Sequence, residues 1–435
     1  MVRAVSRKEQ EMGIHTYATA TEGIGGVLKL DPQHFRVDEI SRYPAPRGDG
    51  PVLVLRVEAL DIEQNELLRR LSGWLGLPLG KFGIAGTKDR RALSTQLISC
   101  PYVDLPAGGP HLSGVRLLES YRAEEGLFLG HLYGNAFDVM VSEVEVPLSQ
   151  GQDRVRSTME QLERFGGYPN FFGPQRFGEV RPVTHRVGRV LVLGSMAEAV
   201  ETYLTLETEG EASDGKLARQ SYRQHHDARR ALTEFPLHLR FERLLLERLA
   251  RGDSPERAFR ALPRHLKSLF VHAYQSYLFN EYLSLRLKEG LPLVHPMPGD
   301  LLQRRGADGL TGDMPPVVVM PDNLPEAEAM IASGRAVVAA PLIGTDSPAL
   351  SGRPGELFRQ VLEVEQVQPS DFHLSDVPRL SSHGALRPLL ARLPYHFYRR
   401  TVEWTADGSP RFRFCLDKGC YATVLLREFL KPESS

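Results

Sequence analysis

The stretch "KFGIAGTKDRRALSTQLIS", from Lys81 to Ser99, places one acidic residue, Asp89, among three basic ones, Lys88, Arg90 and Arg91. A glycine-punctuated apolar run comes before this cluster, and "LSTQLIS" after it is rich in residues that favour strands. We therefore expect Asp89 to lie on a loop between two extended segments. The segments around this loop then decide what kind of sheet holds it.

Strand and helix patterns alternate through the first third of the chain. Residues 51–60, "PVLVLRVEAL", and residues 135–146, "NAFDVMVSEVEV", alternate like strands. Residues 63–77 carry leucines at helical spacing, and residues 149–165 read as a helix that two glycines close. An order of strands, helix, strands and helix predicts an α+β domain whose helices cover one face of a sheet.

The middle of the chain has a different secondary-structure pattern. Beyond residue 172 it is rich in helix patterns, of which "LKSLFVHAYQSYLFNEYLSLRLKEG" (266–290) is the clearest. Strand patterns return only near the end, in a piece too short to hold a core of its own, so we expect it to complete the first sheet. The sequence thus predicts a discontinuous domain of residues 1–167 and 389–435, with residues 168–388 inserted.

Bulk composition is that of an ordinary globular protein. The 435 residues are 42% hydrophobic and 25% charged, with a net charge of −1. No apolar run approaches the roughly 18 to 20 residues of a membrane span, and the N-terminus lacks the apolar core of a signal peptide, so we expect a cytoplasmic protein. The sequence does not show an oligomeric state, and a monomer is taken as the expectation. The three cysteines form no C-x-x-C pair, which argues against a disulfide framework and a structural zinc site.

One region is locally basic. Residues 213–268 contain eleven Arg and two Lys against seven acidic residues, a net charge of +6. Such an excess fits either a face that follows phosphates or the solvated surface of ordinary helices. Both interpretations stay open from the sequence.

The sequence does not have the residue spacing of known nucleotide-binding or metal-binding motifs. "GIAGTKD" has two residues between its glycines and Thr before Lys, whereas a phosphate loop needs G-x-x-x-x-G-K-[ST]. His225 and His226 are adjacent and have no third ligand nearby, and no G-x-S-x-G elbow occurs. We therefore expect no metal and no cofactor.

Six motifs in chain order resemble those of one enzyme family. "AGTKDRRA" (85–92) followed by Thr95-Gln96, "YPNFFGPQRFG" (168–178) and "GNAF" (134–137) closely resemble signatures of the TruD family of tRNA pseudouridine synthases. "LKLDPQHFRVDEI" (28–40) is similar to its N-terminal segment, "YQSYLFNEYLSLRL" (274–287) to its inserted-domain helix, and "KGCYATVLLRE" (418–428) to its C-terminal strand motif. His34 and Cys420 depart from the family pattern, which usually has Asp and Ser there.

This resemblance implies the pseudouridine synthase fold, with a mixed and mostly antiparallel sheet plus an inserted, helix-rich TRUD domain. It implies that the chain converts uridine to pseudouridine in tRNA without a cofactor, with position 13 as the expected target. On the matching positions, Asp89 would be the catalytic carboxylate and Lys29 its ion-pair partner. Phe35, Asn135 and Tyr421 would bind the substrate.

The remaining basic residues of the motifs suit RNA phosphates. Lys88, Arg90, Arg91 and Arg176 are predicted phosphate contacts. A second hypothesis, from another functional class, is an RNA-binding or tRNA-chaperone protein that keeps the synthase fold but acts without catalysis. Salt-dependent RNA binding that survives the loss of Asp89 would distinguish it from the enzyme.

Overall fold

The protein is described here by a computed structural model covering residues 4–88, 90–106, 109, 112–306, 309–311, 314–393 and 401–431. These residues divide into two compact units. The sheet unit consists mainly of Thr19–Tyr168 and Ala391–Glu433, and the helical unit of Ala4–Ala18 and Pro169–Leu390. The two-residue strands β7 (Tyr168–Pro169) and β12 (Leu390–Ala391) lie where the chain passes from one unit to the other.

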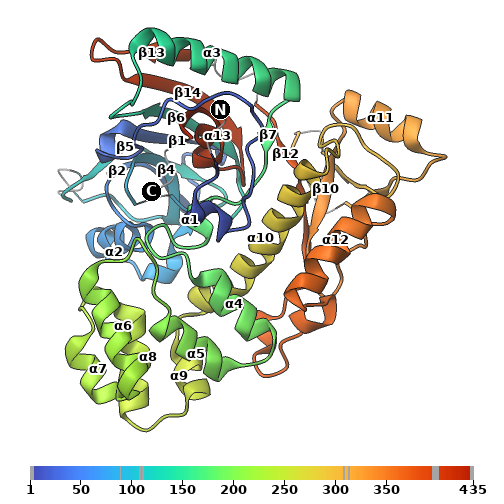
Figure 1. The fold of residues 1–435 in the computed structure, drawn as a ribbon. Helices are drawn as coiled ribbons and strands as arrows, with labels where there is room; N and C mark the ends of the chain where they lie inside the picture. Colours follow the sequence, from blue (N-terminus) through green and yellow to red (C-terminus); the bar gives the residue numbers. More distant parts are fainter. Residues whose placement is uncertain are drawn as a thin grey trace. The chain divides into compact units, whose positions relative to one another are not determined.

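A mixed sheet forms the centre of the sheet unit (Figure 1). Its strands run in the order β13-β14-β6-β1-β4-β2-β5, and β3 also pairs with β4. Among the described pairings, β1 with β4 is parallel and the others are antiparallel. The predicted α+β class with a mixed, mostly antiparallel sheet is confirmed. The strands are β1 (Phe35–Ser41), β2 (Val52–Leu60), β3 (Gly83–Ile84), β4 (Leu93–Pro101), β5 (Val115–Ala123), β6 (Leu132–Met140), β13 (Thr401–Trp404) and β14 (Pro410–Asp417).

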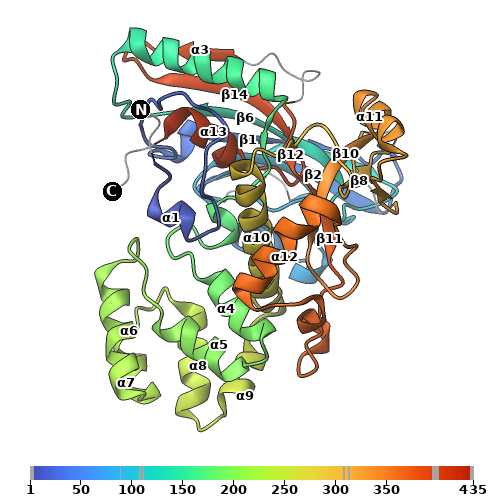
Figure 2. The same cartoon turned by 45° about the vertical axis from the view of Figure 1, so that its right-hand side comes forward.

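Within the described residues of the sheet unit, three α-helices pack on the strands: α2 (Gln64–Leu75), α3 (Leu148–Phe165) and α13 (Ala422–Leu430). The leucines of α2 at helical spacing are buried against the apolar side chains of β2, such as Leu55. Phe429 of α13 contacts Phe412 of β14, with 5.1 Å between ring centroids. Figures 1 and 2 both show α3 running alongside β13 and β14. These contacts bury the apolar side chains that the strand and helix patterns contain.

Two predicted strand segments end differently in the structure. The predicted strand 135–146 is β6, which begins at Leu132 and stops at Met140; Glu143, with a φ of 54°, is not extended. The segment that resembled a C-terminal strand motif is wrong as a strand, because residues 422–430 form α13. All but one of these nine residues are buried. The strand expectation came from the resemblance, although Thr423, Arg427 and Glu428 lie at helical spacing in the sequence.

The long helix α10 (Arg264–Lys288) is the core of the helical unit. Its buried residues include Phe270, Tyr274 and Leu278, and it packs on α4 (Thr184–Val192) and α12 (Gly352–Glu365). Figure 2 shows α12 beside α10. The other helices of eight or more residues are α5 (Met196–Thr205), α6 (Ser213–His225), α8 (Arg240–Ala250) and α11 (Leu324–Ala332); the shorter ones are α1 (Arg7–Gln10), α7 (Ala228–Glu234) and α9 (Pro255–Ala261). A small sheet in the order β11-β10-β8-β9 contains Ala385–Pro388, Ala336–Leu342, Leu301–Arg304 and Val317–Val318.

The N-terminal segment Ala4–Ala18 belongs to the helical unit, whereas the sequence had assigned it to the first domain. Hydrogen bonds to α10 account for the difference. The Asn280 amide donates to the carbonyl of Met12 over 2.9 Å, and the Ser284 hydroxyl donates to that of Gly13 over 2.7 Å. Such contacts between residues more than 260 positions apart leave no local trace in the sequence.

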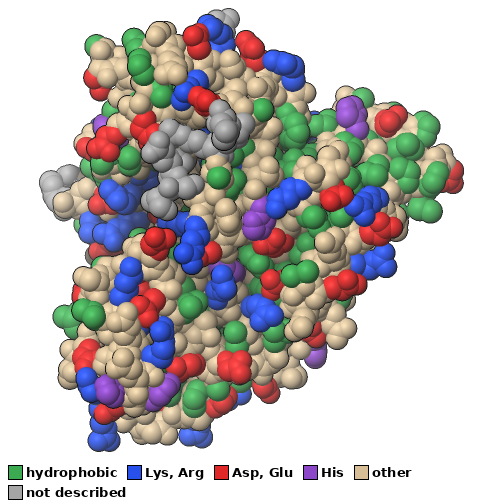
Figure 3. Space-filling view, viewed as in Figure 1, with side chains coloured by type: hydrophobic (Ala, Val, Ile, Leu, Met, Phe, Trp, Pro, Cys, Tyr) green, Lys and Arg blue, Asp and Glu red, His purple; other side chains and the backbone are tan. Residues whose placement is uncertain are grey.

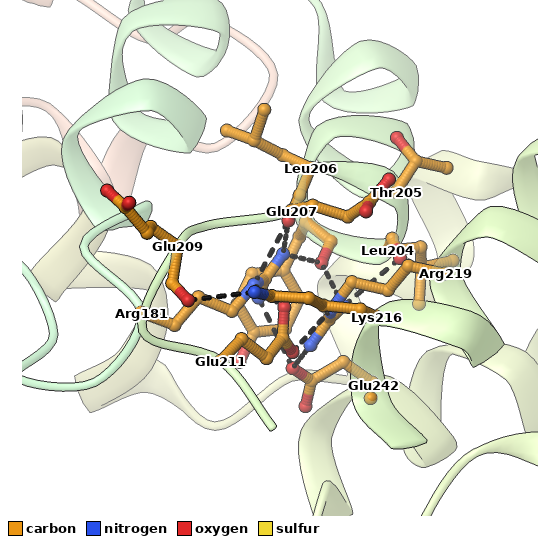
Figure 4. A network of polar contacts seen from close by, with 12 residues as sticks. Arg181, Leu204, Thr205, Leu206, Glu207, Glu209, Glu211, Lys216, Arg219 and Glu242 are labelled. Atoms are coloured by element: carbon orange, nitrogen blue, oxygen red, sulfur yellow. Dashed lines mark hydrogen bonds and ion pairs between the residues drawn. The ribbon is translucent and has the colours of Figure 1, made fainter. Parts of the chain in front are cut away.

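The basic stretch 213–268 forms α6 to α9 and the start of α10, and part of its charge is internal. Arg219 is fully buried: it donates to Glu211 over 2.8 Å, to Glu242 over 2.9 Å, and to the carbonyls of Tyr203 and Leu204 (Figure 4). Figure 3 shows that the exposed basic side chains of these helices are interspersed with acidic ones. On the face shown in Figure 3, the excess of +6 does not form a single cationic patch.

No helix within the described residues is long and apolar enough to cross a membrane. The same residues contain no group of three or more His, Cys, Asp or Glu side chains that could hold a metal ion. Cys100, Cys415 and Cys420 are not joined in disulfides, and burial raises the pKa of Cys100 and of Cys415 to about 11.

Candidate active site

The loop that carries Asp89 leaves the sheet at a gap along one edge of β4. At its start β4 pairs with β1, Arg36 lying opposite Leu93, and further along it pairs with β3, Ile84 lying opposite Ile98. The other edge of β4 pairs with β2 along its whole length. Strands β1 and β3 therefore share the remaining edge and leave Gln96 and Leu97 between them. The segment from Ala85 to Ala92 connects β3 to β4 at this gap.

Both ends of this loop are fixed to neighbouring backbone. The amide of Gly130 donates to the carbonyl of Ala85 over 2.8 Å, and the amide of Asp61 donates to that of Ala92 over 3.0 Å. Ala85 and Ala92 are each only 1% exposed. Asp89 itself lies outside the described residues, but the segments that lead to it and away from it are held in place.

A buried ion pair lies at the base of the loop. The Lys88 ammonium donates to Glu39 Oε2 over 2.6 Å and to Asn135 Oδ1 over 3.0 Å. The side chains of Lys88 and Glu39 are 5% and 0% exposed. Glu39 Oε1 also accepts from the Ser41 hydroxyl over 2.6 Å and from the backbone amide of Leu97 over 3.5 Å. Both oxygens of Glu39 are thus hydrogen-bonded, as a buried carboxylate requires.

The sheet brings the two partners of Lys88 together. Glu39 and Asn135 lie directly opposite each other on β1 and β6. Because a lysine ammonium can only donate, the amide oxygen of Asn135 must face it, which leaves the amide nitrogen as the donor of this side chain. Asn135 was expected to bind the substrate, and an asparagine amide can offer a uracil both a donor and an acceptor. In the structure the acceptor is engaged by Lys88.

Lys88 was predicted to contact RNA phosphate, and its position differs from that expectation. A phosphate contact requires an exposed ammonium, whereas this one is buried and paired with a carboxylate. The sequence shows that a lysine precedes Asp89 but not which way its side chain turns. Lys88 therefore anchors the loop to β1 and β6.

Lys29 and Phe35 lie next to each other at the start of β1. Lys29 is 5% exposed and adopts a left-handed conformation, with a φ of 59°, and its ammonium is 4.6 Å from the centroid of the Phe35 ring. Phe35 is 1% exposed and contacts Phe137, which stacks on Phe414. Phe35 is therefore a core residue that packs under Lys29, and the ammonium is held against an aromatic face.

Tyr421 lies at the N-terminus of α13, in the N-cap position, and is half-buried. It follows the end of β14, where Leu416 lies opposite Asn135 and Asp417 lies opposite Gly134. A Cβ atom on Gly134 would come within 2.0 Å of the Leu416 carbonyl oxygen, so only glycine allows β14 to approach β6 this closely. The turn before Tyr421 therefore begins at the end of β14 that lies beside Asn135.

The predicted phosphate contacts other than Lys88 are all on the surface or in the other unit. Arg90 and Arg91 are exposed: Arg90 lies 3.9 Å from Asp61, and Arg91 donates to the carbonyl of Leu30 over 3.5 Å. Arg176 belongs to the helical unit, where it donates to the Ser276 hydroxyl over 3.0 Å. Phosphate contact by these three residues stays a prediction.

A separate group of charges lies on the opposite face of the sheet. Asp138 is three residues beyond Asn135 on β6 and accepts hydrogen bonds from Arg411 and Arg413 of β14. Burial opposes ionisation of Asp138, but these hydrogen bonds outweigh it and hold its pKa below the usual range. This cluster binds β6 to β14 and does not take part in the Lys88 site.

Glu39 is the site residue that the sequence reasoning missed. Strand β1 buries Phe35 and Val37 on one face, and Glu39 continues that face two residues later. An acidic side chain in phase with buried apolar positions was the available signal, because such a group needs an internal partner.

The fold defines an α+β protein with a mixed central sheet and an inserted helical unit. The family described as tRNA pseudouridine synthase D (TruD) matches residues 11–429. A relative from Halobacterium salinarum that carries this name is 36% identical, with 98% of this chain and 97% of that protein covered, and one from Methanococcoides burtonii is 34% identical, with 99% and 98% covered. The crystal structure of a TruD protein from Methanosarcina mazei superposes with a TM-score of 0.80 at 33% identity, covering 98% of each chain. The chain belongs to the TruD family of pseudouridine synthases, which are isomerases.

Proposed function

We propose that this protein converts uridine to pseudouridine in tRNA, at position 13, with Asp89 as the catalytic carboxylate. The observation that carries the proposal is the loop between β3 and β4, fixed at Ala85 and Ala92 and anchored by Lys88 to Glu39 and Asn135. A loop held in this way can keep one carboxylate in a constant position, which is what a reaction at a single atom requires.

The reaction breaks the bond between uracil N1 and the ribose, turns the base, and joins the same ribose carbon to C5. The C5 proton is lost and N1 gains one, so the product is an isomer of the substrate. Attack by Asp89 on the sugar and removal of the 2′ proton by Asp89 both need an ionised carboxylate. An ordinary aspartate, with a pKa of about 3.9, is already ionised at neutral pH.

The described neighbours suit this chemistry. Lys29 supplies a buried positive charge next to Phe35 at the start of β1, and we assign it the role of positioning Asp89. The amide nitrogen of Asn135 is available to donate to a uracil carbonyl, since its oxygen is bound to Lys88. Tyr421 offers an aromatic ring on which the extruded base stacks, a contact worth roughly 1–3 kcal/mol.

The test is pseudouridine formation on unmodified tRNA by the purified full-length protein. Wild type should modify uridine 13, Asp89→Asn should give no product above the level without enzyme, and a tRNA with cytidine at position 13 should remain unmodified. Asp49→Asn is the matched control, because Asp49 is a 79% exposed carboxylate of the same unit. Full activity in Asp89→Asn would refute the assignment of Asp89, and product at another uridine would refute the assigned position.

A further inference from the structure

Two large apolar side chains project from the loop between β5 and β6. Phe128 is 60% exposed and Leu129 is 74% exposed. Among the large hydrophobic residues exposed within the described part of the chain, they are the only two that are adjacent in sequence. Single exposed apolar residues are common and need no explanation, but an adjacent pair at a loop tip is a candidate contact surface.

This tip is rigidly held on both sides. Leu127, on one side, is 3% exposed, packs with Ala85 and Leu132, and donates its backbone amide to the Ser99 hydroxyl over 2.8 Å. Gly130, on the other side, donates its amide to the carbonyl of Ala85. The exposed pair is therefore fixed to the segment that begins four residues before Asp89. A surface that is already ordered loses little conformational entropy when it binds.

Cationic and aromatic groups flank the same tip. The Lys418 ammonium lies 3.3 Å from the carbonyl oxygen of Gly130, and the backbone amide of Arg42 donates to the carbonyl of His131 over 3.1 Å. The guanidinium of Arg42 is 5.0 Å from the ring centroid of Tyr133, and the His131 ring packs against the edge of Phe128. Positive charge next to exposed aromatic side chains is the combination that binds unstacked nucleotides.

We propose that Phe128 and Leu129 form a wedge that stacks on the nucleobase next to the target uridine and fills the space that the uridine leaves. The proposal rests on the function proposed above. Extruding a base from a folded RNA costs a few kcal/mol, and one stacking contact returns roughly 1–3 kcal/mol. The tether to Ala85 places this contact beside the loop that carries Asp89, so extrusion and catalysis use one connected element.

The decisive variant is Phe128→Ala combined with Leu129→Ala, measured as kcat/KM for pseudouridine formation on intact tRNA. Loss of one stacking contact of 1–3 kcal/mol predicts a decrease of about 5- to 150-fold. Leu217→Ala is the control, because Leu217 is 64% exposed on α6 of the helical unit and should stay at the wild-type value. Phe128→Trp should keep most of the activity, since it preserves the aromatic face. Thermal unfolding of each variant checks that the fold is intact.

A second substrate separates stacking from a general weakening of RNA binding. In a tRNA with an abasic site next to the target, wild type should lose activity, and the double alanine variant should lose little more, because the partner of the wedge is already absent. Equal losses by the double alanine variant on intact and abasic tRNA would overturn the proposal, as would an unchanged kcat/KM on intact tRNA. A change of oligomeric state in the double alanine variant would identify the tip as a protein contact and would also overturn it.

A fluorescence measurement of base stacking tests the wedge without requiring catalysis. With 2-aminopurine in place of the base next to position 13, wild type and Asp89→Asn should both quench its fluorescence by stacking, and the double alanine variant should not. If wild type quenches but forms no pseudouridine, the proposed function fails while the wedge stands. If wild type forms pseudouridine without quenching, the wedge fails while the proposed function stands.

Discussion

Both units of the molecule contain a buried network of charges, and the two networks are built differently. In the helical unit the Arg219 guanidinium donates hydrogen bonds to two carboxylates and two backbone carbonyls. The acceptors are Glu211, Glu242, Tyr203 and Leu204. In the sheet unit Lys88 has one carboxylate and one amide as described partners, and it stands on a loop rather than on a helix. The first network joins fixed elements to each other, whereas the second joins a loop to a sheet.

Charge balance supports this difference. Arg219 and Arg181 share Glu211 and Glu242, so two cations meet two carboxylates. Burial, followed by the charge of Arg219, lowers the pKa of Arg181 to about 10, as expected for a second cation inside the helical unit. The carboxylates are thus needed to keep both guanidiniums inside. We infer that the fully paired charges of the helical unit stabilise the fold. The ion pair of Lys88 with Glu39 instead positions the loop that carries Asp89.

The largest loss of stability is expected when the network of the helical unit loses Arg219. Arg219→Met leaves two buried carboxylates with only Arg181, and removing one partner of a buried ion pair costs about 3–5 kcal/mol of unfolding free energy. Urea unfolding measures this loss. Arg223→Met is the control, because Arg223 is 51% exposed and should cost less than about 1 kcal/mol. Equal stabilities of Arg219→Met and wild type would show that the network does not hold the helices together.

The loop network should respond in activity more than in stability. Glu39→Gln keeps the shape of the side chain but removes the charge that holds Lys88, so the loop before Asp89 is expected to shift. A misplacement of about 1 Å at a reacting group costs about 100-fold in rate. Single-turnover measurements should show this decrease in the rate of pseudouridine formation, while the affinity for tRNA changes by no more than about twofold, since Glu39 is 0% exposed and cannot touch RNA.

Ser41→Ala is the matched control for Glu39→Gln. It removes one hydrogen bond from the same carboxylate and leaves the Lys88 ion pair in place, so about 1 kcal/mol of stability and little activity should be lost. If both variants lower the rate equally, the carboxylate acts through general packing and the distinction between the two networks is wrong.

The sequence predicts the secondary structure around Asp89 better than the partners of its side chains. Strands β2 and β4 and helices α2, α3 and α10 follow from apolar periodicity and from glycine stops, because these are local signals. Strand β5 was not predicted, and α13 was taken for a strand because its segment resembled a strand motif.

Ion-pair partners are harder to predict because they are distant in the chain. Lys88 and Glu39 are 49 residues apart, and Lys88 and Asn135 are 47 apart, so only the register of β1 with β6 shows that they meet. The sequence therefore assigned Lys88 to phosphate on its charge alone. Arg219 and Glu242 are 23 residues apart on different helices, and nothing in the basic stretch 213–268 marks which arginine turns inward.

A buried histidine without a paired carboxylate should stay neutral in the folded protein. We therefore expect the unfolding free energy of the helical unit to fall in acid. His185 of α4 is 2% exposed and stacks on Tyr277; burial, followed by the charge of Arg186, lowers its pKa to about 3. Above about pH 6.5 the imidazole is neutral whether the protein is folded or unfolded, so nothing is lost. Below it the unfolded chain takes up a proton that the folded chain refuses until about pH 3. Relative to pH 7.5, wild type should therefore lose about 2 kcal/mol of unfolding free energy at pH 5 through this residue.

His185→Phe tests this directly, because phenylalanine keeps an aromatic ring between Phe177 and Tyr277 but cannot titrate. Urea unfolding of both proteins at pH 7.5 and pH 5 gives four free energies, and the acid-induced loss in wild type should exceed that in the variant by the same amount of about 2 kcal/mol. Parallel losses in the two proteins would mean that folded His185 accepts the proton, and that a buried cation in this unit does not need a carboxylate of its own. That outcome would remove the reason for treating Glu211 and Glu242 as the groups that make Arg219 tolerable inside the helices.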